Sequence, residues 1–494
     1  MTTGRRWMAV LAAAAGSCLL PVGAWSPAAA AATASGPPAC ANPVSTWSVD
    51  QLVEQLLMVG GQFSNLSASA GAASAGVGGF VLFGQPPAGS GPAIRAGLSS
   101  LAGDAVAAGR VVPWFSTDEE GGPVARLSQV IGGLPSARQM AAVWTPAQVQ
   151  SNLAAHGAAM RSLGVNMDLA PVLDVASPAN TIASEDQRSF SDNPQTAAVY
   201  GTAFAAGLRS AGVVPVGKHF PGMGHASADT DLSPATDPPL SQLQSDDLIP
   251  FAQAAGAGIP VVMVGHPSVP GLTGSQPASL SPAAYQYLRN TTRFGGVALT
   301  DDLDAGAISA AGYSQPAAAV QAIEAGADMA MIDASAWSSA ADALRQAVSS
   351  GALPLPRVEA SVRRILAAKS VPECPTVGMA AVPAGGGYWI VGGGGAVEHF
   401  GTAGGYGTLT GVHLNQPVVG MAATPDGRGY WLTASDGGIF AFGDARFYGS
   451  TGGIHLNQPV VGIAPTPDGR GYWLTATDGG IFSFGDARFY GSGA

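Results

Sequence analysis

The stretch from Lys218 to Asp231 carries the side chains best suited to acid–base or covalent chemistry. It begins with Lys218 and His219, which directly follow the apolar run 213–216, and that run predicts a buried strand whose end would hold the two donors rigidly. The residues after them are small and rich in glycine, and they lead to Asp229 and Asp231. We therefore expect a mobile loop that can bring a carboxylate to a substrate.

Seven further apolar runs also predict strands, and alanine-rich segments with helical periodicity separate them. Eight strands that alternate with helices predict an α/β fold, a (β/α)₈ TIM-type barrel. No glycine-rich phosphate turn follows the first strand, which disfavours an open doubly wound sheet. The runs are 57–60, 78–83, 111–116, 165–172, 213–218, 259–264, 296–300 and 327–332.

Polar side chains stand where these strands would end, at the rim that carries function in such barrels. A single aspartate there is more often a helix cap than a catalyst, but six strand ends contribute to this rim. Carboxylates mixed with arginine, lysine and histidine suit a sugar, because they bind hydroxyls and supply the two carboxylate-type groups of glycoside cleavage. The candidates are Asp118, Arg126, Asp168, Asp174, Arg188, Lys218, His219, His266, Asp301, Asp302 and Asp333.

The runs Lys-His-Phe-Pro-Gly at 218–222 and Thr-Asp-Asp-Leu at 300–303 resemble motifs of bacterial β-N-acetylhexosaminidases of glycoside hydrolase family 3. The resemblance extends over about 46–369. It implies that Asp301 is the nucleophile, while Asp302 has a structural role such as capping the next helix. It also implies a sugar pocket with two supporting carboxylates behind its cations. The pocket residues would be Asp118, Arg126, Arg188, Lys218 and His219, and the supports Asp168 and Asp174.

The acid/base is where the sequence departs from the family. There, an aspartate on the loop orients a histidine two residues later; here Asp229 takes the orienting position and Asp231 that of the histidine. Asp231 could be the acid itself, with a pKa raised by burial and by Asp229. His225 on the same loop could move in instead, or the barrel could bind sugar and cleave it slowly or not at all. His266 either lines the rim or is a satisfied core histidine.

The resemblance implies a secreted retaining β-N-acetylhexosaminidase that hydrolyses terminal N-acetyl-β-glucosaminides of cell-wall-type glycans. The alternatives are a β-glucosidase of the same family and a weakly active or inactive cell-surface glycan-binding protein. The net charge of −11 argues against a nucleic-acid partner. We expect no metal and no organic cofactor, since the 7 histidines are scattered and the chain has no phosphate loop.

The first residues predict export. Arg5 and Arg6 precede an apolar run and an alanine-rich stretch, so we expect a signal peptide over 1–32, a linker over 33–45 and a secreted or envelope-associated protein without a transmembrane segment. Cys18 lies in a weak lipobox, which makes lipid anchoring the less favoured alternative. Cys40 and Cys374 bracket the barrel region 46–374, and we expect them to form a disulfide in an oxidising compartment.

From 375 to 494 the sequence repeats three times at a period of 42 residues, and each copy contains a Tyr-Trp pair and a Tyr-Gly pair. Each copy predicts several short strands, the size of a propeller blade. Three blades are too few for a closed ring, so the repeats form an open array, a small assembly or part of an oligomeric ring. They resemble arrays in secreted actinobacterial proteins, which implies a cell-wall polymer as partner. Blade core is the favoured role of Trp389, Trp431 and Trp473 over sugar stacking.

Overall fold

The computed structural model describes residues 44, 47–176, 187–371, 376–409, 412 and 414–493. The predicted signal peptide lies outside these residues, as does the linker apart from Val44. Cys18, Cys40 and Cys374 also lie outside them, so the lipid anchor and the disulfide stay predictions.

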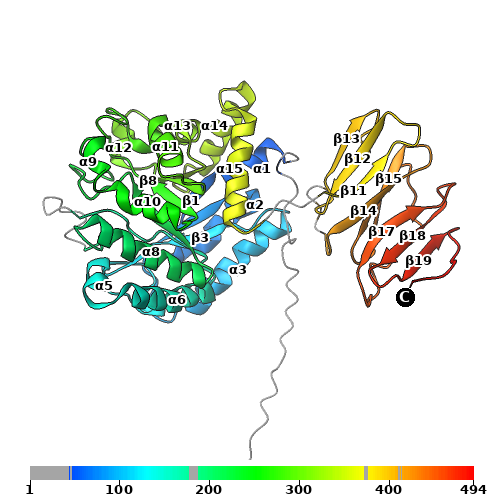
Figure 1. Ribbon diagram of the computed structural model, residues 1–494, viewed down its shortest axis with the longest axis horizontal. Helices are drawn as coiled ribbons and strands as arrows, with labels where there is room; N and C mark the ends of the chain where they lie inside the picture. The colour runs from blue at the N-terminus through cyan, green and yellow to red at the C-terminus, as the bar shows by residue number, and fades with distance from the viewer. Residues whose placement is uncertain are drawn as a thin grey trace, which may run out of the picture. The chain divides into compact units, whose positions relative to one another are not determined.

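Eight parallel strands close into a barrel, which confirms the predicted fold class (Figure 1). Each strand pairs with the next barrel strand along the chain, and the last pairs with the first. The strands are β1 (Leu57–Gln62), β2 (Gly79–Phe83), β3 (Trp114–Thr117), β6 (Met167–Asp168), β7 (Val214–Phe220), β8 (Val261–Val264), β9 (Val297–Asp302) and β10 (Met329–Ile332).

Several strands are shorter than their apolar runs predicted, and in two of them, β3 and β6, a proline stands beside the strand. β3 begins only after Pro113, and β6 ends before Pro171, although Val172 forms one more bridge with Lys218. Proline has no backbone NH and cannot donate to the ladder, which weakens pairing beside both strands, although Pro215 is accommodated within β7. Apolarity predicted the place of these strands better than their lengths.

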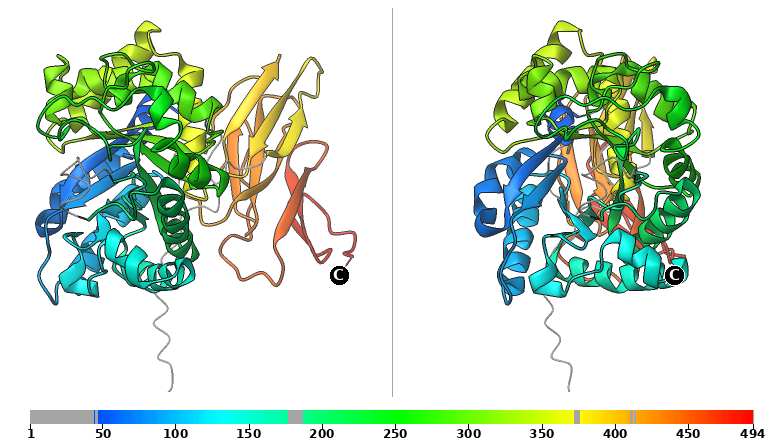
Figure 2. Two further views of the ribbon diagram at one scale, coloured as in Figure 1. Left: turned by 60° about the vertical axis from the view of Figure 1, so that its left-hand side comes forward. Right: turned by 90° about the vertical axis from the view of Figure 1, so that its left-hand side faces the viewer.

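Helices surround the strands (Figure 2). The first begins as predicted, because the Ser48 side chain accepts a hydrogen bond from the Gln51 NH at 3.2 Å and the Gln51 side chain accepts one from the Ser48 NH at 2.9 Å. The helices are α1 (Val49–Gln55), η2 (Phe63–Ser69), α2 (Ala70–Ala75), α3 (Gly91–Ala107), α4 (Ser128–Ile131), α5 (Ala137–Val143), α6 (Pro146–Leu163), α8 (Pro194–Ser210), α9 (Leu240–Leu243), α10 (Leu248–Gly256), η3 (Ala278–Leu280), α11 (Pro282–Asn290), α12 (Gly306–Ala310), α13 (Gln315–Ala325), α14 (Trp337–Ser350) and α15 (Leu355–Ala368).

The barrel strands are buried on both faces, by helices outside and by side chains inside. Every residue of β8 and β10 is buried, for example. Strands covered on both sides are continuous apolar runs rather than alternating ones, which is why apolarity located them in the sequence. The rim of the barrel is polar, and after β3 the chain forms a small hairpin of β4 (Glu119–Gly121) and β5 (Val124–Ala125).

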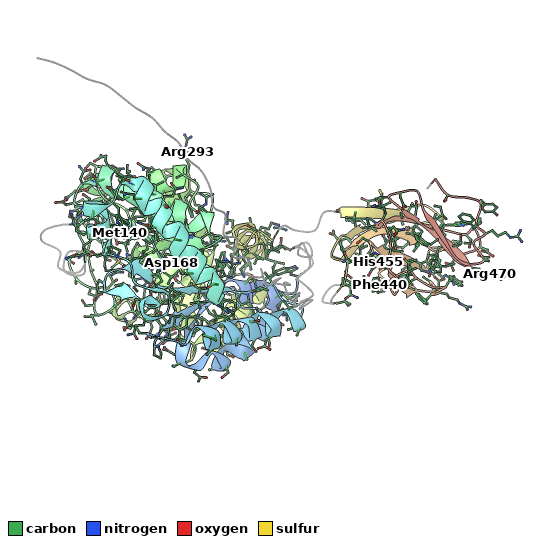
Figure 3. All side chains as sticks on the ribbon, turned by 90° about the horizontal axis from the view of Figure 1, so that it is seen from below. Met140, Asp168, Arg293, Phe440, His455 and Arg470 are labelled. Carbon is green, nitrogen blue, oxygen red and sulfur yellow. The ribbon has the colours of Figure 1, made fainter. Side chains whose placement is uncertain are left out.

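The three repeats each form a three-stranded antiparallel sheet. Trp389 and Trp431 are fully buried, which confirms core positions for these two, and the turns between strands carry exposed charges such as that of Arg470 (Figure 3). The sheets are β11 (Thr376–Ala381), β12 (Gly387–Gly392) and β13 (Val397–Gly401); β14 (Val418–Ala423), β15 (Gly429–Ala434) and β16 (Ile439–Gly443); and β17 (Val460–Pro465), β18 (Gly471–Ala476) and β19 (Ile481–Gly485). Within the described parts of the chain, no helix has both the length and the apolar character that crossing a bilayer requires.

Candidate active site

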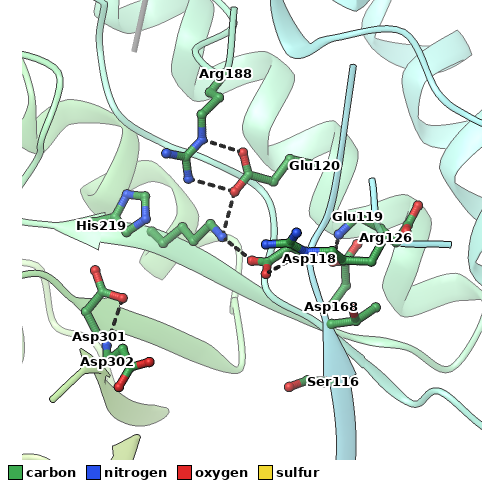
Figure 4. A network of polar contacts seen from close by, with 12 residues as sticks. Ser116, Asp118, Glu119, Glu120, Arg126, Asp168, Arg188, His219, Asp301 and Asp302 are labelled. Carbon is green, nitrogen blue, oxygen red and sulfur yellow. Dashed lines mark hydrogen bonds and ion pairs between the residues drawn. The ribbon is translucent and has the colours of Figure 1, made fainter. Parts of the chain in front are cut away.

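A network of alternating charges lies at the carboxyl ends of β3 and β7 (Figure 4). Lys218 Nζ is 2.9 Å from Asp118 Oδ1 and 2.7 Å from Glu120 Oε1. Arg188 donates two hydrogen bonds to Glu120, from Nε at 2.7 Å and from Nη2 at 2.8 Å. The structure thus brings together three of the predicted sugar-binding residues, and Glu120 joins them.

The opposite charges in this network keep one another ionised. Burial favours the neutral form of Glu120, yet Lys218 and Arg188 hold its pKa far below the usual range. Burial likewise disfavours charge on Lys218, but Asp118 and Glu120 raise its pKa. The charge of Glu120 is the main cause of the raised pKa of Arg188. The network therefore presents charged donors and acceptors, the stronger kind of partner for sugar hydroxyls.

Arg126 lies on the more open side of Asp118. Its Nε is 3.8 Å from Asp118 Oδ2, and the side chain is 35% exposed. The backbone NH of Arg126 donates to the Asp118 carbonyl at 3.1 Å across the hairpin, which fixes the two residues relative to each other. The structure places Arg126 where a ligand that contacts Asp118 can also reach it.

Asp174 orients His219. Its Oδ2 is 2.7 Å from His219 Nδ1, and its Oδ1 accepts hydrogen bonds from the backbone NH groups of His219, at 3.0 Å, and Met223, at 2.9 Å. Burial opposes the charged form of Asp174, but the His219 ring and the backbone NH groups of Met223 and His219 together lower the pKa of Asp174. A carboxylate on Nδ1 leaves the Nε2 side of the ring for other contacts, so Asp174 stands in the supporting position expected for it.

Asp168 does not touch the cations that it was expected to support. Its Oδ1 accepts a hydrogen bond from the backbone NH of Glu119 at 3.0 Å, and no described residue bonds to its buried Oδ2. Burial, together with the charge of Glu119, raises the pKa of Asp168 well above that of a free aspartate. Asp168, labelled in Figure 3, therefore holds the backbone of the Asp118–Glu120 segment rather than a charged side chain.

Asp301 stands near the end of β9, on the same rim (Figure 4). Its Oδ1 accepts a hydrogen bond from the backbone NH of Asp302 at 3.0 Å. Burial favours the neutral acid, but the histidines His219 and His266, the Asp302 NH and Lys218 together lower the pKa of Asp301. The carboxylate is therefore ionised at neutral pH, as a nucleophile has to be.

Both ring nitrogens of His266 are bonded within the protein. Nδ1 lies 2.7 Å from Ser279 Oγ, and Nε2 donates to the Asp302 carbonyl at 2.8 Å. The ring is 1% exposed, and burial lowers its pKa. His266 is thus a satisfied buried histidine, the favoured alternative from the sequence, and it also braces the strand end that carries the nucleophile candidate.

Asp302 was expected to cap the next helix, and the structure corrects this. Its Oδ1 accepts a hydrogen bond from the Asp304 NH at 3.0 Å, ahead of the first turn of α12. The residue before α12 is Ala305, whose side chain cannot cap. Burial, followed by the charges of Asp301, Asp333 and Asp304, raises the pKa of Asp302 to about 7.

The loop after β7 places Asp231 near Asp301. Asp229 Oδ1 accepts a hydrogen bond from the Asp231 NH at 3.0 Å, so Asp229 fixes the backbone of the turn that carries Asp231. Asp231 is accessible to solvent, yet its pKa is raised. The largest cause is partial desolvation by the surrounding protein, followed by the negative charge of Asp301 and then that of Asp229. The structure therefore brings Asp229, Asp231 and Asp301 together.

Backbone hydrogen bonds hold this loop against α12. The Gly306 NH donates to the Asp231 carbonyl at 2.8 Å, and the Ala307 NH donates to the Thr230 carbonyl at 3.1 Å. The first NH groups of a helix have no partner within the helix, and here the loop carbonyls accept from them in place of a capping side chain. We call this pair of hydrogen bonds the loop latch; it joins the loop of Asp231 to the helix that follows the strand of Asp301.

His225 points elsewhere. Its Nδ1 lies 3.0 Å from Asp247 Oδ2, and its Nε2 lies 3.9 Å from Asp246 Oδ2. The hydrogen bond with Asp247 is the main reason for the raised pKa of His225. These three residues are the one group among those described whose ligand atoms are spaced to hold a metal ion. The structure does not bring His225 to Asp301, which disfavours it as the proton donor.

Glu120 is the residue that sequence reasoning missed. The run Asp-Glu-Glu-Gly-Gly pointed to this segment, but the type and spacing of its residues do not separate Glu119 from Glu120. Neighbouring side chains on a strand point in opposite directions. Glu119 turns towards His156 and the Leu127 NH, whereas Glu120 faces Arg188 and Lys218. One signal was available in the sequence. It predicted two cations for this rim, Arg188 and Lys218, without a carboxylate to pair with both, and it offered two glutamates directly after Asp118.

Chemically, the rim combines Asp301, whose pKa is lowered, Asp231, whose pKa is raised, and a cluster of charged hydrogen-bonding groups. The first can attack a carbon, and the second can hold a proton for a leaving group at a higher pH. The charged cluster can bind the hydroxyls of the substrate that is attacked. These are the parts that cleavage of a glycosidic bond requires.

Comparison with known proteins points to one family. The model of the glycosyl hydrolase family 3 N terminal domain matches residues 48–368. Beta-hexosaminidase LpqI of Mycobacterium tuberculosis is 42% identical over 273 residues, which are 53% of this chain and 70% of that protein. The solved structure of M. tuberculosis LpqI superposes with a TM-score of 0.60 at 38% identity, covering 67% of this chain and 98% of that one. A β-N-acetylglucosaminidase from Paenibacillus sp. gives 0.61 at 30% identity, covering 65% and 62%. The chain belongs to glycosyl hydrolase family 3 and is a glycoside hydrolase.

Proposed function

We propose that the chain is a retaining β-N-acetylhexosaminidase that removes terminal N-acetyl-β-glucosaminides from cell-wall-type glycans. The observation that carries the proposal is the pair Asp301 and Asp231, whose pKa values are shifted in opposite directions at one rim of the barrel. Retaining hydrolysis needs an ionised nucleophile and a protonated acid at the same time. The N-acetyl preference is supported by two similar proteins, which are named a beta-hexosaminidase and a β-N-acetylglucosaminidase.

In the proposed reaction, Asp301 attacks C1 while Asp231 donates its proton to the leaving oxygen. The bond from C1 to that oxygen breaks, and a glycosyl ester forms on Asp301. Asp231, now ionised, takes a proton from water, which attacks C1 and releases the sugar with its original configuration. Lys218, Arg188 and Asp118 hold the hydroxyls during both steps.

The test is turnover of aryl N-acetyl-β-glucosaminides by the wild type and by Asp301→Ala. We expect kcat/KM to fall at least about 10³-fold, equivalent to ~4 kcal/mol of barrier. Asp304→Asn is the control, since Asp304 is an exposed aspartate three residues away whose charge is not among the main influences on Asp301. Equal rates for wild type and Asp301→Ala would show that another group is the nucleophile.

Two further measurements address stereochemistry and substrate. Proton magnetic resonance of the first sugar released should show the β anomer before mutarotation; an α anomer first would exclude retention. A fluorinated glycoside that slows release of the ester should leave a mass adduct on the peptide that contains Asp301. Turnover of aryl β-glucosides above that of N-acetylglucosaminides would favour the β-glucosidase alternative, and sugar binding without turnover would favour a glycan-binding protein.

We also propose that the protein acts outside the membrane, and that its repeats hold it near a cell-wall polymer. The support is the sequence of the first 32 residues and the likeness of the repeats to arrays in secreted proteins. Mass spectrometry of the mature protein checks this: cleavage near residue 32 is expected, lipid on Cys18 would establish the anchored form, and an uncleaved chain would contradict export.

A further inference from the structure

The Tyr-Trp pair of each repeat gives the sheet two different faces. Successive side chains of a strand point to opposite faces, so the tyrosine faces one neighbour and the tryptophan the other. The Tyr430 ring packs 5.7 Å from the Trp389 ring, and the Tyr472 ring packs 5.8 Å from the Trp431 ring, centroid to centroid. The tryptophan face of one repeat therefore receives the tyrosine of the next.

Hydrogen bonds repeat at both of these junctions. The inserted tyrosine donates its hydroxyl to a glycine carbonyl of the preceding repeat, Tyr430 to Gly407 and Tyr472 to Gly449. In the other direction, Tyr406 donates to the Gly427 carbonyl at 3.0 Å and Tyr448 donates to the Gly469 carbonyl, also at 3.0 Å. The tyrosines that are inserted are buried, 1% exposed for Tyr430 and 0% for Tyr472.

Glycine is required at the contact points. A Cβ on Gly407 would lie 2.4 Å from the Phe442 ring, and one on Gly449 would lie 2.6 Å from the Phe484 ring. Both positions have φ above +130°, a region that side chains rarely allow. The equivalent Gly491 in the third repeat keeps φ +126° but has no heavy atom of the described chain within 4 Å of its Cβ position.

The same groups are exposed in the first and the third of the described repeats. In the third repeat, Tyr490 is 84% exposed and contacts Trp473 alone among the described aromatic residues, at 6.4 Å. In the first repeat, Tyr388 is 41% exposed and stacks on Phe400, itself 39% exposed, at 5.0 Å. Among the described residues, the third repeat therefore presents a receiving face without an inserted tyrosine, and the first presents a tyrosine without a receiving face.

We propose that these two ends dock onto each other between two copies of this chain, with Tyr388 of each copy inserted between Trp473 and Tyr490 of the other. By analogy with the internal junctions, the Tyr388 hydroxyl donates to the Gly491 carbonyl of the other copy, and Tyr490 donates to its Gly385 carbonyl. The contact joins unlike faces, so it can close a ring. Two copies of the three described repeats supply six, within the four to eight blades of closed propellers, whereas three copies would supply nine.

Closure also explains why such a small contact can suffice. A single tyrosine-centred junction between free molecules is weak, but a two-chain ring contains the junction twice. Once the first has formed, the second is intramolecular and gains from a high effective concentration. The prediction is a dimer with no detectable half-closed form.

The test is light scattering of the full chain after gel filtration over a range of concentrations. The expected mass is twice that of one chain. Tyr388→Ser and Tyr490→Ser should each give a monomer. Both side chains are exposed, so their loss should leave the fold intact, which circular dichroism checks. Phe489→Ser is the matched control: its counterpart Phe447 is 60% exposed although its repeat is followed by another, so this position lies outside the junction.

A mixing experiment identifies the faces. Tyr388→Ser retains the receiving face and Tyr490→Ser retains the inserted tyrosine, so the two variants together should form a 1:1 heterodimer through one intact junction, weaker than the wild-type dimer. A monomeric wild type at all concentrations would overturn the proposal, and so would a Tyr388→Ser variant that still dimerises alone. Assemblies larger than two chains would overturn the six-repeat ring.

Discussion

Replacing Gly306 by alanine tests the proposed role of Asp231 as the proton donor. A Cβ at this position would lie 2.5 Å from the Leu232 carbonyl oxygen and 3.0 Å from that of Asp231. Ordinary contact begins at 3.4 Å, so Gly306→Ala has to push the Leu232 carbonyl away by about 0.9 Å. The displacement also strains the 2.8 Å hydrogen bond from residue 306 to the Asp231 carbonyl. The variant therefore moves the loop of Asp231 and leaves every side chain of the site unchanged.

The expected loss follows from that displacement. Shifting a catalytic group by about 1 Å can cost up to ~10²-fold in rate. For an N-acetylglucosaminide with a poor leaving group, we expect kcat/KM to fall roughly 10- to 100-fold in Gly306→Ala. For the 2,4-dinitrophenyl glycoside the fall should be less than about threefold, because this leaving group departs without a proton. Loss of one strained hydrogen bond should lower stability by only about 1 kcal/mol.

The assay compares kcat/KM across a series of aryl leaving groups, since kcat/KM covers the steps up to formation of the glycosyl ester. The control is Gly295→Ala, whose added Cβ meets no atom within 4 Å and which keeps an ordinary φ. It should behave as the wild type. An equal loss for good and poor leaving groups would mean that the latch does not act through proton donation, and no loss at all would mean that the loop position is irrelevant to catalysis.

Three further predictions concern charges. Glu120→Gln leaves two buried cations without their shared carboxylate, and should lower the free energy of unfolding by about 3 kcal/mol in urea titrations and raise KM; unchanged stability and KM would contradict its bridging role. The alkaline limb of kcat/KM should report the raised pKa of Asp231 and the acid limb the lowered pKa of Asp301, so Asp231→His, with an ordinary pKa of ~6.5, should move only the alkaline limb upward. The pKa of Asp168 is raised in the folded state, so above pH ~3.9 the unfolded chain releases a proton that the folded protein keeps, and the stability of the wild type falls as the pH rises from there towards the folded-state pKa. Asparagine cannot ionise, so the gain in melting temperature of Asp168→Asn should grow from pH 4 towards neutrality. A gain that stays constant with pH would argue against a protonated Asp168.

Apolar periodicity located the barrel because strands covered on both faces have to be continuous apolar runs, and the capping box at Ser48 marked the first helix by its own local chemistry. Roles that depend on direction could not be predicted in this way. Asp168 lies beside a charged network but bonds to a backbone NH, and Asp302 precedes a helix but does not cap it. Which neighbour a carboxylate meets depends on where its strand end points, and spacing along the chain does not contain that information.

The loop latch is built entirely from main-chain atoms, and this has a consequence for how the family can diverge. Because the carbonyls of residues 230 and 231 make these hydrogen bonds whatever side chains they carry, the side chain of the proposed proton donor can change without removing the latch. We therefore expect the main chain to stay in place when a histidine replaces the aspartate at position 231. Natural variation at this residue should therefore adjust the working acidity of these enzymes, while the glycine at 306 resists replacement.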